Sequence, residues 1–139
     1  MAEQQPSMGV IPHLTVSNGV AAIEFYVKGL GGKEKSRHPA EDGKRLMHAE
    51  VEINGSPIFL NDDFPEMMGG KSKTPKSIGG TPVTLHLNVP NCDDAVKRAE
   101  AAGAKVTMQP FDAFWGMRYA VIVDPFGHEW ALAHDLPQK

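Results

Sequence analysis

Hydrophobic and polar residues alternate along residues 11–16, with Leu14 and Val16 on one face. A period of two is typical of a strand that buries one face. Asn18 then offers a helix N-cap, and apolar residues follow at helical spacing over residues 20–27 until a glycine-rich stretch ends the pattern. The beginning of the chain therefore predicts a strand followed by a capped helix.

Three further strands are predicted in the first half, near residues 33–37, 46–53 and 57–61. The last two are separated by Asn54-Gly55, a dipeptide typical of a two-residue hairpin turn. The first half thus has the order strand, helix, strand, strand, strand.

The second half repeats this order. Residues 13–22 and 86–95 share the frame His-Leu-x-Val followed by a capped helix, and the later strands match at similar offsets. A long repeat that occurs only twice indicates two paired βαβββ modules with a cleft between them. The elements predicted for the second half are a strand at 83–89, a helix at 92–102, and strands at 105–109, 118–123 and 129–133.

The predicted fold is α+β, with two βαβββ modules forming a curved mixed sheet around a cleft. We expect one domain over residues 9–136, made of a module at 9–62 and a module at 81–136. The intervening residues 63–80 are rich in Gly, Lys, Pro and Ser and too polar for a core element. They are predicted to be a linker or a flap.

Composition excludes several classes of protein. With 41% hydrophobic and 22% charged residues, the chain is typical of globular proteins. A net charge of −3 without a long basic run makes nucleic acid an unexpected partner. No apolar run is long enough to span a bilayer, and residues 1–7 lack the apolar core of a signal peptide. Cys92 is the single cysteine, so no internal disulfide is expected, and the expected compartment is the cytoplasm.

Two motifs point to a family. The first helix opens with Ala-Ala-Ile-Glu-Phe-Tyr at residues 21–26, and the last hairpin contains Asp-Pro-Phe-Gly-His-Glu-Trp at 124–130. With the duplication, they resemble the vicinal oxygen chelate superfamily of glyoxalases, bleomycin-resistance proteins and extradiol dioxygenases. Residues 114–119 (Phe-Trp-Gly-Met-Arg-Tyr) and 47–50 (Met-His-Ala-Glu) are similar to its PhnB-like branch, although Met117 stands where that branch usually has an acidic residue.

This resemblance implies a divalent metal held between the modules and chelated by two oxygens of a substrate. Its ligands are His or Glu on the first and last strands of each module. The matching positions in this chain are Ile11, Phe59, Thr84 and Ala131. Because none of these is a good metal ligand, we expect no metal at the usual positions and no other cofactor.

His13 and His86 occupy equivalent positions on the two first strands, on the face expected to line the cleft. We expect them to approach each other across the cleft floor. With Glu50 they are the candidate catalytic residues, for acid–base chemistry or for a displaced metal site. The alternative is that both histidines are silent polar core residues, matched only because the module was copied.

The candidate ligand-binding residues are His48 on the third strand and Trp115, Arg118 and Tyr119 in the second module. The indole ring could stack on a planar ligand, and the guanidinium could pair with a carboxylate or phosphate. The alternative is a loop that buries its own rings as an anchor. Trp130 alternates to the other face of its strand and is interpreted as core that faces the helices.

Three functions remain open at this point. The favoured one is a metal-free protein that binds a small, partly aromatic molecule in the cleft. The second is a lyase, isomerase or dioxygenase of the glyoxalase kind that uses His13, His86 and Glu50. The third is a structural or regulatory dimer with a filled cleft. A homodimer is expected, with Met67 and Met68 of the linker in a buried contact.

Overall fold

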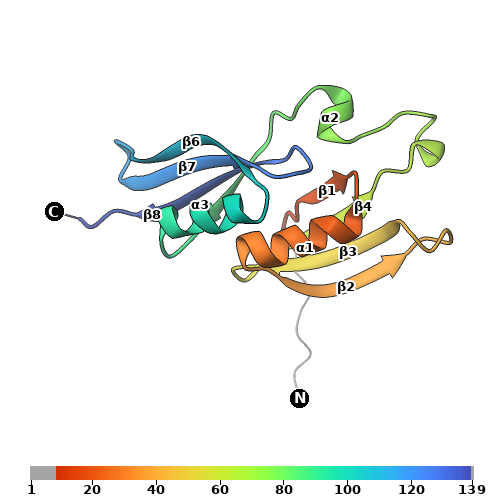
Figure 1. Ribbon diagram of the computed structural model, residues 1–139, viewed down its shortest axis with the longest axis horizontal. Coiled ribbons are helices and arrows are strands. Elements are labelled where there is room, and N and C mark those ends of the chain that lie inside the picture. Colours follow the sequence, from red (N-terminus) through yellow and green to blue (C-terminus); the bar gives the residue numbers. More distant parts are fainter. Residues whose placement is uncertain (1–8, 139) are drawn as a thin grey trace, which may run out of the picture.

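The computed structural model describes residues 9–138 and contains two four-stranded mixed sheets (Figure 1). The strand orders are β1-β4-β3-β2 and β5-β8-β7-β6, with the first pair parallel in each sheet. The first module consists of β1 (His13–Val16), α1 (Gly19–Leu30), β2 (Lys33–Pro39), β3 (Leu46–Ile53) and β4 (Ser56–Asp62). The second consists of β5 (Thr84–Asn88), α3 (Cys92–Ala101), β6 (Lys105–Asp112), β7 (Met117–Val123) and β8 (Glu129–Asp135). The prediction for residues 1–7 lies outside the described residues.

Both helices begin at the expected asparagine caps. Asn18 Oδ1 accepts from the backbone N–H of Ala21 at 3.1 Å, and Asn91 Oδ1 accepts from that of Asp94 at 3.0 Å. Each bond satisfies one of the free donors of a helix start. The βαβββ order predicted for each half is therefore confirmed.

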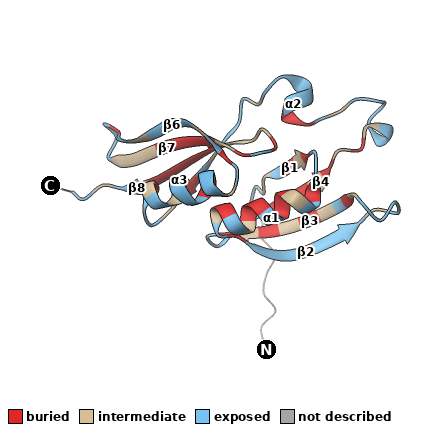
Figure 2. Cartoon of the chain, viewed as in Figure 1, coloured by how far each residue is buried: buried red, intermediate tan, exposed pale blue. Residues whose placement is uncertain are grey.

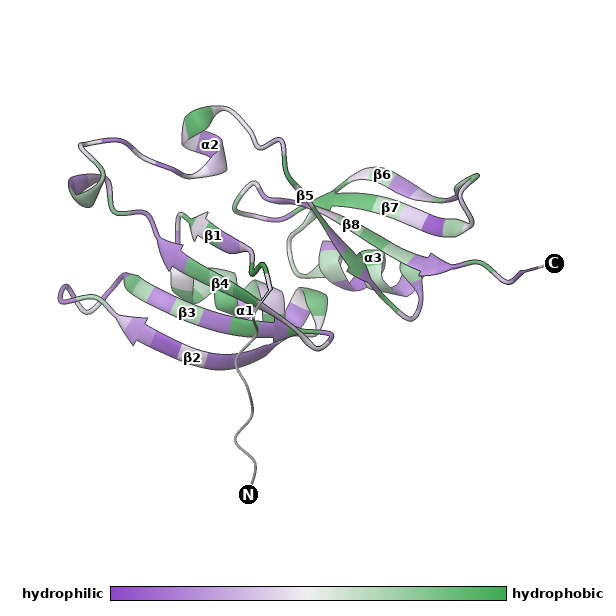
Figure 3. Cartoon of the chain, turned by 180° about the vertical axis from the view of Figure 1, so that it is seen from behind, coloured by the Kyte–Doolittle hydropathy of each residue, from purple (hydrophilic) through white to green (hydrophobic). Residues whose placement is uncertain are grey.

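The helices form one layer and the strands another. In Figure 1 α1 and α3 lie in front of the sheets, and Figure 3 shows the strands from the other side. Figure 2 shows buried positions on α1, β7 and β8, whereas the edge strand β2 is exposed. One hydrophobic core lies between the layers and includes residues from both modules. Each sheet therefore buries the face that carries the helices.

A buried carboxylate connects the two modules. Asp124, in the turn after β7, is 3% exposed and accepts hydrogen bonds from Tyr26 Oη of α1 at 2.6 Å and from Trp130 Nε1 at 3.0 Å. Its other oxygen accepts from the backbone N–H groups of Phe126 and His128. Burial and the adjacent carboxylate raise the pKa of Tyr26 well above its ordinary value. The interpretation of Trp130 as helix-facing core is confirmed.

The segment between the modules lies outside both sheets. It contains a short 3-10 helix η1 (Pro65–Met67) and the one-turn helix α2 (Pro75–Ile78). Thr74 is buried, and its hydroxyl caps α2 by accepting from the N–H of Ser77 at 3.3 Å. Among the described residues, no helix is long and apolar enough to cross a membrane.

Candidate functional site

Each sheet has one face that no helix covers. On β3 the buried residues Ala49, Val51 and Ile53 alternate with partly exposed residues, among them His48 and Glu50. The partly exposed set faces away from α1 because successive side chains on a strand point to opposite faces. We call this uncovered side the open face of the sheet.

The open face of the first sheet carries a cluster of rings, here the first ring cluster: His13, His38, His48 and Phe59. The His48 ring lies 4.7 Å from that of Phe59, 5.7 Å from that of His13 and 6.1 Å from that of His38. Strand register explains the arrangement, because His13 is the partner of Phe59 and His38 is the partner of His48. His48 thus lies at the centre of the cluster, in ring contact with the other two imidazoles and with the phenyl ring.

The imidazoles of the first ring cluster have unused hydrogen-bonding capacity. Within residues 9–138 none of their nitrogens forms a hydrogen bond or ion pair with protein. Burial lowers the pKa of His48, the neighbouring His13 and His38 lower it further, and Glu50 opposes the shift. The lowered pKa favours the neutral imidazole, which can donate one hydrogen bond and accept another.

The open face of the second sheet carries a second ring cluster: His86, Phe111, Phe114, Trp115 and Tyr119. Tyr119 lies at its centre, with ring centroids 5.3 Å from Trp115, 6.1 Å from Phe111 and 6.2 Å from His86. Phe114 is 97% exposed and Trp115 50% exposed. The alternative in which this loop anchors itself by burying these rings is therefore wrong.

The structure does not bring His13 and His86 into contact. No ring contact joins the two clusters anywhere in the described chain. His13 lines a cavity of about 390 Å³ with Asn61 and linker residues. His86 lines another of about 510 Å³, beside the β3–β4 turn, and its Nε2 lies 2.9 Å from Asn88 Oδ1. The expected trio of His13, His86 and Glu50 is thus divided, and Glu50 lies near His48 instead.

Arg118 lies on the helix-covered side of its sheet and not on the open face. Its guanidinium pairs with Asp93 of α3 at 2.7 Å and with Asp112 of β6 at 2.8 Å. The same pairing lowers the pKa of Asp93. Tyr119, the next residue on the strand, points to the opposite face. Arg118 therefore does not join the other candidate ligand-binding residues.

The positions that correspond to the superfamily's metal ligands do not fit a metal. Ile11 precedes β1, Phe59 packs its ring against His13 and His48, and Ala131 presents a buried methyl group. The hydroxyl of Thr84 donates to Glu129. In the part of the chain that the structure describes, no three His, Cys, Asp or Glu side chains are arranged to hold a metal ion.

Two members of the first ring cluster, His38 and Phe59, are not evident as ligand-binding residues from the sequence. His38 lies on the polar edge strand β2, and only the antiparallel register with β3 places it beside His48. In the sequence Phe59 stands out only as a position equivalent to a metal ligand. Phe111 is the register partner of Tyr119, but a bulge in β6 hides this relation in the sequence.

The chain matches the model of the Glyoxalase/Bleomycin resistance protein/Dioxygenase superfamily over residues 10–132. It belongs to this superfamily. The uncharacterized protein Rv0887c of Mycobacterium tuberculosis is 53% identical over 121 residues, which cover 87% of this chain and 71% of that protein. The uncharacterized protein Mb0911c of Mycobacterium bovis is also 53% identical over 121 residues, which cover 87% of this chain and 79% of that protein.

Solved structures share the fold of this superfamily member. A glyoxalase-related enzyme from Fulvimarina pelagi superposes with a TM-score of 0.72 at 20% identity, over 93% of this chain and 89% of that chain. TioX from Micromonospora sp. ML1 superposes with a TM-score of 0.68 at 21% identity, over 94% of this chain and 98% of that chain. At these identities the likeness concerns the paired-module architecture alone.

Proposed function

We propose that this superfamily member binds a small, partly aromatic molecule on the open faces of its sheets, without a metal at the usual superfamily positions. The observation that carries the proposal is the gathering of rings on both open faces where the superfamily would place metal ligands. On the second face a planar ligand can stack on Trp115 or Tyr119, and on the first face the unpaired imidazole nitrogens can form hydrogen bonds with polar groups of a ligand.

The chemistry of the metal-ligand positions supports a metal-free mode of binding. An aliphatic, a phenyl, a hydroxyl and a methyl side chain occupy them, and a divalent ion needs several nitrogen, oxygen or sulfur donors that converge. Affinity would then come from ring contacts and hydrogen bonds. We also assign the chain to the PhnB-like branch, on the segments 114–119 and 47–50.

A homodimer is part of this proposal. The second ring cluster leaves Phe114 97% exposed and Trp115 50% exposed, and Met67 of the linker is 63% exposed. Phe114 and Trp115 form one exposed apolar patch, and such patches mark binding surfaces. A second copy would shield them and enclose the ligand, and neither nucleic acid nor a membrane is expected as a partner.

Calorimetric titration with quinoline, a neutral planar probe, tests the binding site. Trp115→Ala should weaken binding about tenfold, because one stacking contact contributes about 1–3 kcal/mol. Val20→Ala is the control, since Val20 is 43% exposed on α1 and belongs to neither ring cluster. Equal affinities for wild type and Trp115→Ala would contradict the assignment of this face.

Acid–base catalysis is the second candidate function. The depressed pKa of His48 favours it, since a neutral imidazole beside a carboxylate can accept a proton from a substrate. This candidate lyase or isomerase site uses His48, His13 and Glu50, and does not include His86. If turnover of an aromatic substrate is found, His48→Gln should abolish turnover while binding persists. Loss of both together would assign His48 to binding alone.

A further inference from the structure

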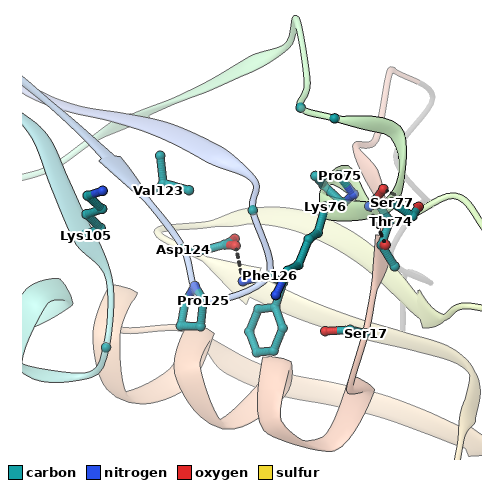
Figure 4. A pocket seen from close by; sticks show the side chains of 14 residues that line it. Ser17, Thr74, Pro75, Lys76, Ser77, Lys105, Val123, Asp124, Pro125 and Phe126 are labelled. Carbon is teal, nitrogen blue, oxygen red and sulfur yellow. Dashed lines mark hydrogen bonds between the residues drawn. The ribbon is translucent and has the colours of Figure 1, made fainter.

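A separate cavity lies away from both ring clusters, between the linker and the turn after β7. It has a volume of about 750 Å³, within the range of small-molecule sites. It is lined by four separate segments: Ser17, the linker residues around α2, the α3–β6 junction and the turn after β7. Figure 4 shows these segments surrounding the cavity.

Two lysines from opposite sides supply the charge of this cavity. In Figure 4 the Lys76 side chain reaches from α2 toward Phe126 and Ser17, while Lys105 stands across the cavity beside Val123. Neither ammonium group forms a salt bridge or hydrogen bond with residues 9–138. Both are therefore available to an anion.

The lining offers no competing carboxylate. Asp124 is the one acidic residue among the lining side chains, and both of its oxygens accept hydrogen bonds from buried or backbone donors. It is 3% exposed and serves as an internal link between α1 and the turn. The accessible charge of the cavity is therefore positive.

The rest of the lining suits an apolar body. Rings of Pro75, Pro125 and Phe126 and the side chain of Val123 contribute to the wall. The walls are brought together by close packing, since a Cβ added to Gly127 would lie 2.9 Å from Cβ of Pro75. Gly127 also has a φ of +93°, which disfavours any other residue. Docking of α2 on this turn thus depends on a glycine.

We propose that this cavity is a second binding site, for a small organic anion that combines a carboxylate with a planar or aliphatic apolar body. Lys76 and Lys105 pair with the carboxylate, and Phe126 with the two proline rings contacts the apolar part. This site is independent of the one on the ring clusters.

Naphthoate is a suitable probe, with neutral naphthylmethanol and cationic naphthylmethylamine as matched controls. In amide NMR spectra, naphthoate should shift the signals of Gly79, Gly103 and Gly127, which line the cavity, more than those of the ring clusters. The alcohol should bind about tenfold more weakly, since a charge-assisted hydrogen bond contributes about 1.5–3 kcal/mol. Equal binding of the amine would overturn the proposal.

Lys76→Met and Lys105→Met should each weaken naphthoate binding about five- to tenfold and should reduce its dependence on salt. Lys71→Met is the matched control, because Lys71 belongs to the same linker but does not line the cavity. If Lys71→Met weakens binding as much as Lys76→Met, the effect is nonspecific and the site is wrong. Failure of quinoline to bind the ring clusters would leave these results unchanged, so the two sites are tested separately.

Discussion

The two modules repeat one framework but differ on their open faces. The first face presents three imidazoles and Glu50, whereas the second presents mostly carbon rings around Tyr119, with a single imidazole from His86. The first can exchange hydrogen bonds and protons, and the second can stack. The difference indicates that the copies kept what the core requires and diverged where no helix covers the sheet.

The framework itself repeats down to individual hydrogen bonds. At the end of β4, Asp62 Oδ1 accepts from the backbone N–H of Gly19, the first residue of α1, at 2.9 Å. At the end of β8, His134 Nδ1 accepts from that of Cys92, the first residue of α3, at 2.8 Å. A carboxylate and an imidazole thus perform the same task at matching positions. The geometry is kept although the chemistry has changed.

Asp124→Ala should have the largest effect on stability. This contact joins the modules, and the corresponding turn of the first module has Asn54-Gly55 in place of the aspartate. The variant leaves the Tyr26 hydroxyl and the Trp130 indole N–H unsatisfied in the core. We expect a loss of about 3–5 kcal/mol in the free energy of unfolding. Urea denaturation measures it, and Glu100→Ala on the exposed side of α3 should stay near wild type.

The two equivalent caps should differ in strength. Asp62 is buried and also accepts from the N–H of Leu46 at 2.7 Å, so Asp62→Ala should cost about 2–3 kcal/mol. His134 makes one such bond and is partly exposed, so His134→Ala should cost about 1 kcal/mol. Thermal unfolding of both variants compares them. Equal losses would mean that the carboxylate adds nothing to the cap.

The stability of the protein should depend on pH through His48 on the open face of the first sheet. The pKa of His48 is lower in the folded state than its unfolded value of about 6.5. The contribution of His48 to the free energy of unfolding is therefore complete above about pH 6.5 and is lost as the pH falls through the pKa of the folded state. His13→Ala removes a neighbouring positive charge and should move the pKa of His48 upward. NMR titration of the imidazole signals measures this shift, and an unchanged pKa would show that the two rings are uncoupled.

Arg118→Met should have the smallest effect. Its pairs with Asp93 and Asp112 are partly exposed, and such pairs contribute about 0–1 kcal/mol. Quinoline binding should also be unchanged, because the guanidinium faces α3. A tenfold loss of quinoline affinity would mean that Arg118 contacts the ligand, and would contradict the assignment of Arg118 and Tyr119 to opposite faces of β7.

Much of the fold follows from alternation and capping residues. The bounds of β3 agree with the pattern, because its buried and partly exposed residues alternate without interruption from Ala49 to Ile53. β6 runs to Asp112, beyond the predicted end near residue 109, since bulges interrupt its register. β1 begins at His13 and not at Ile11, because Pro12 has no N–H to donate to a ladder.

The candidate site was less accessible to sequence reasoning. Alternation places His48 and Tyr119 on open faces, and the same rule already separates Arg118 from Tyr119. It cannot set the distance between His13 and His86, which depends on how the modules pack through Asp124 and α1. The partners of Arg118 come from α3 and β6, so they emerge only from tertiary structure.

NMR mapping of quinoline on the wild-type protein tests the central claim most directly, because it reports both open faces at once. We expect the imidazole signals of His48 on the first open face and the ring signals of Trp115 and Tyr119 on the second to shift on titration, in buffer with a metal chelator. Shifts confined to residues outside the two ring clusters, or binding that requires an added divalent metal, would contradict it.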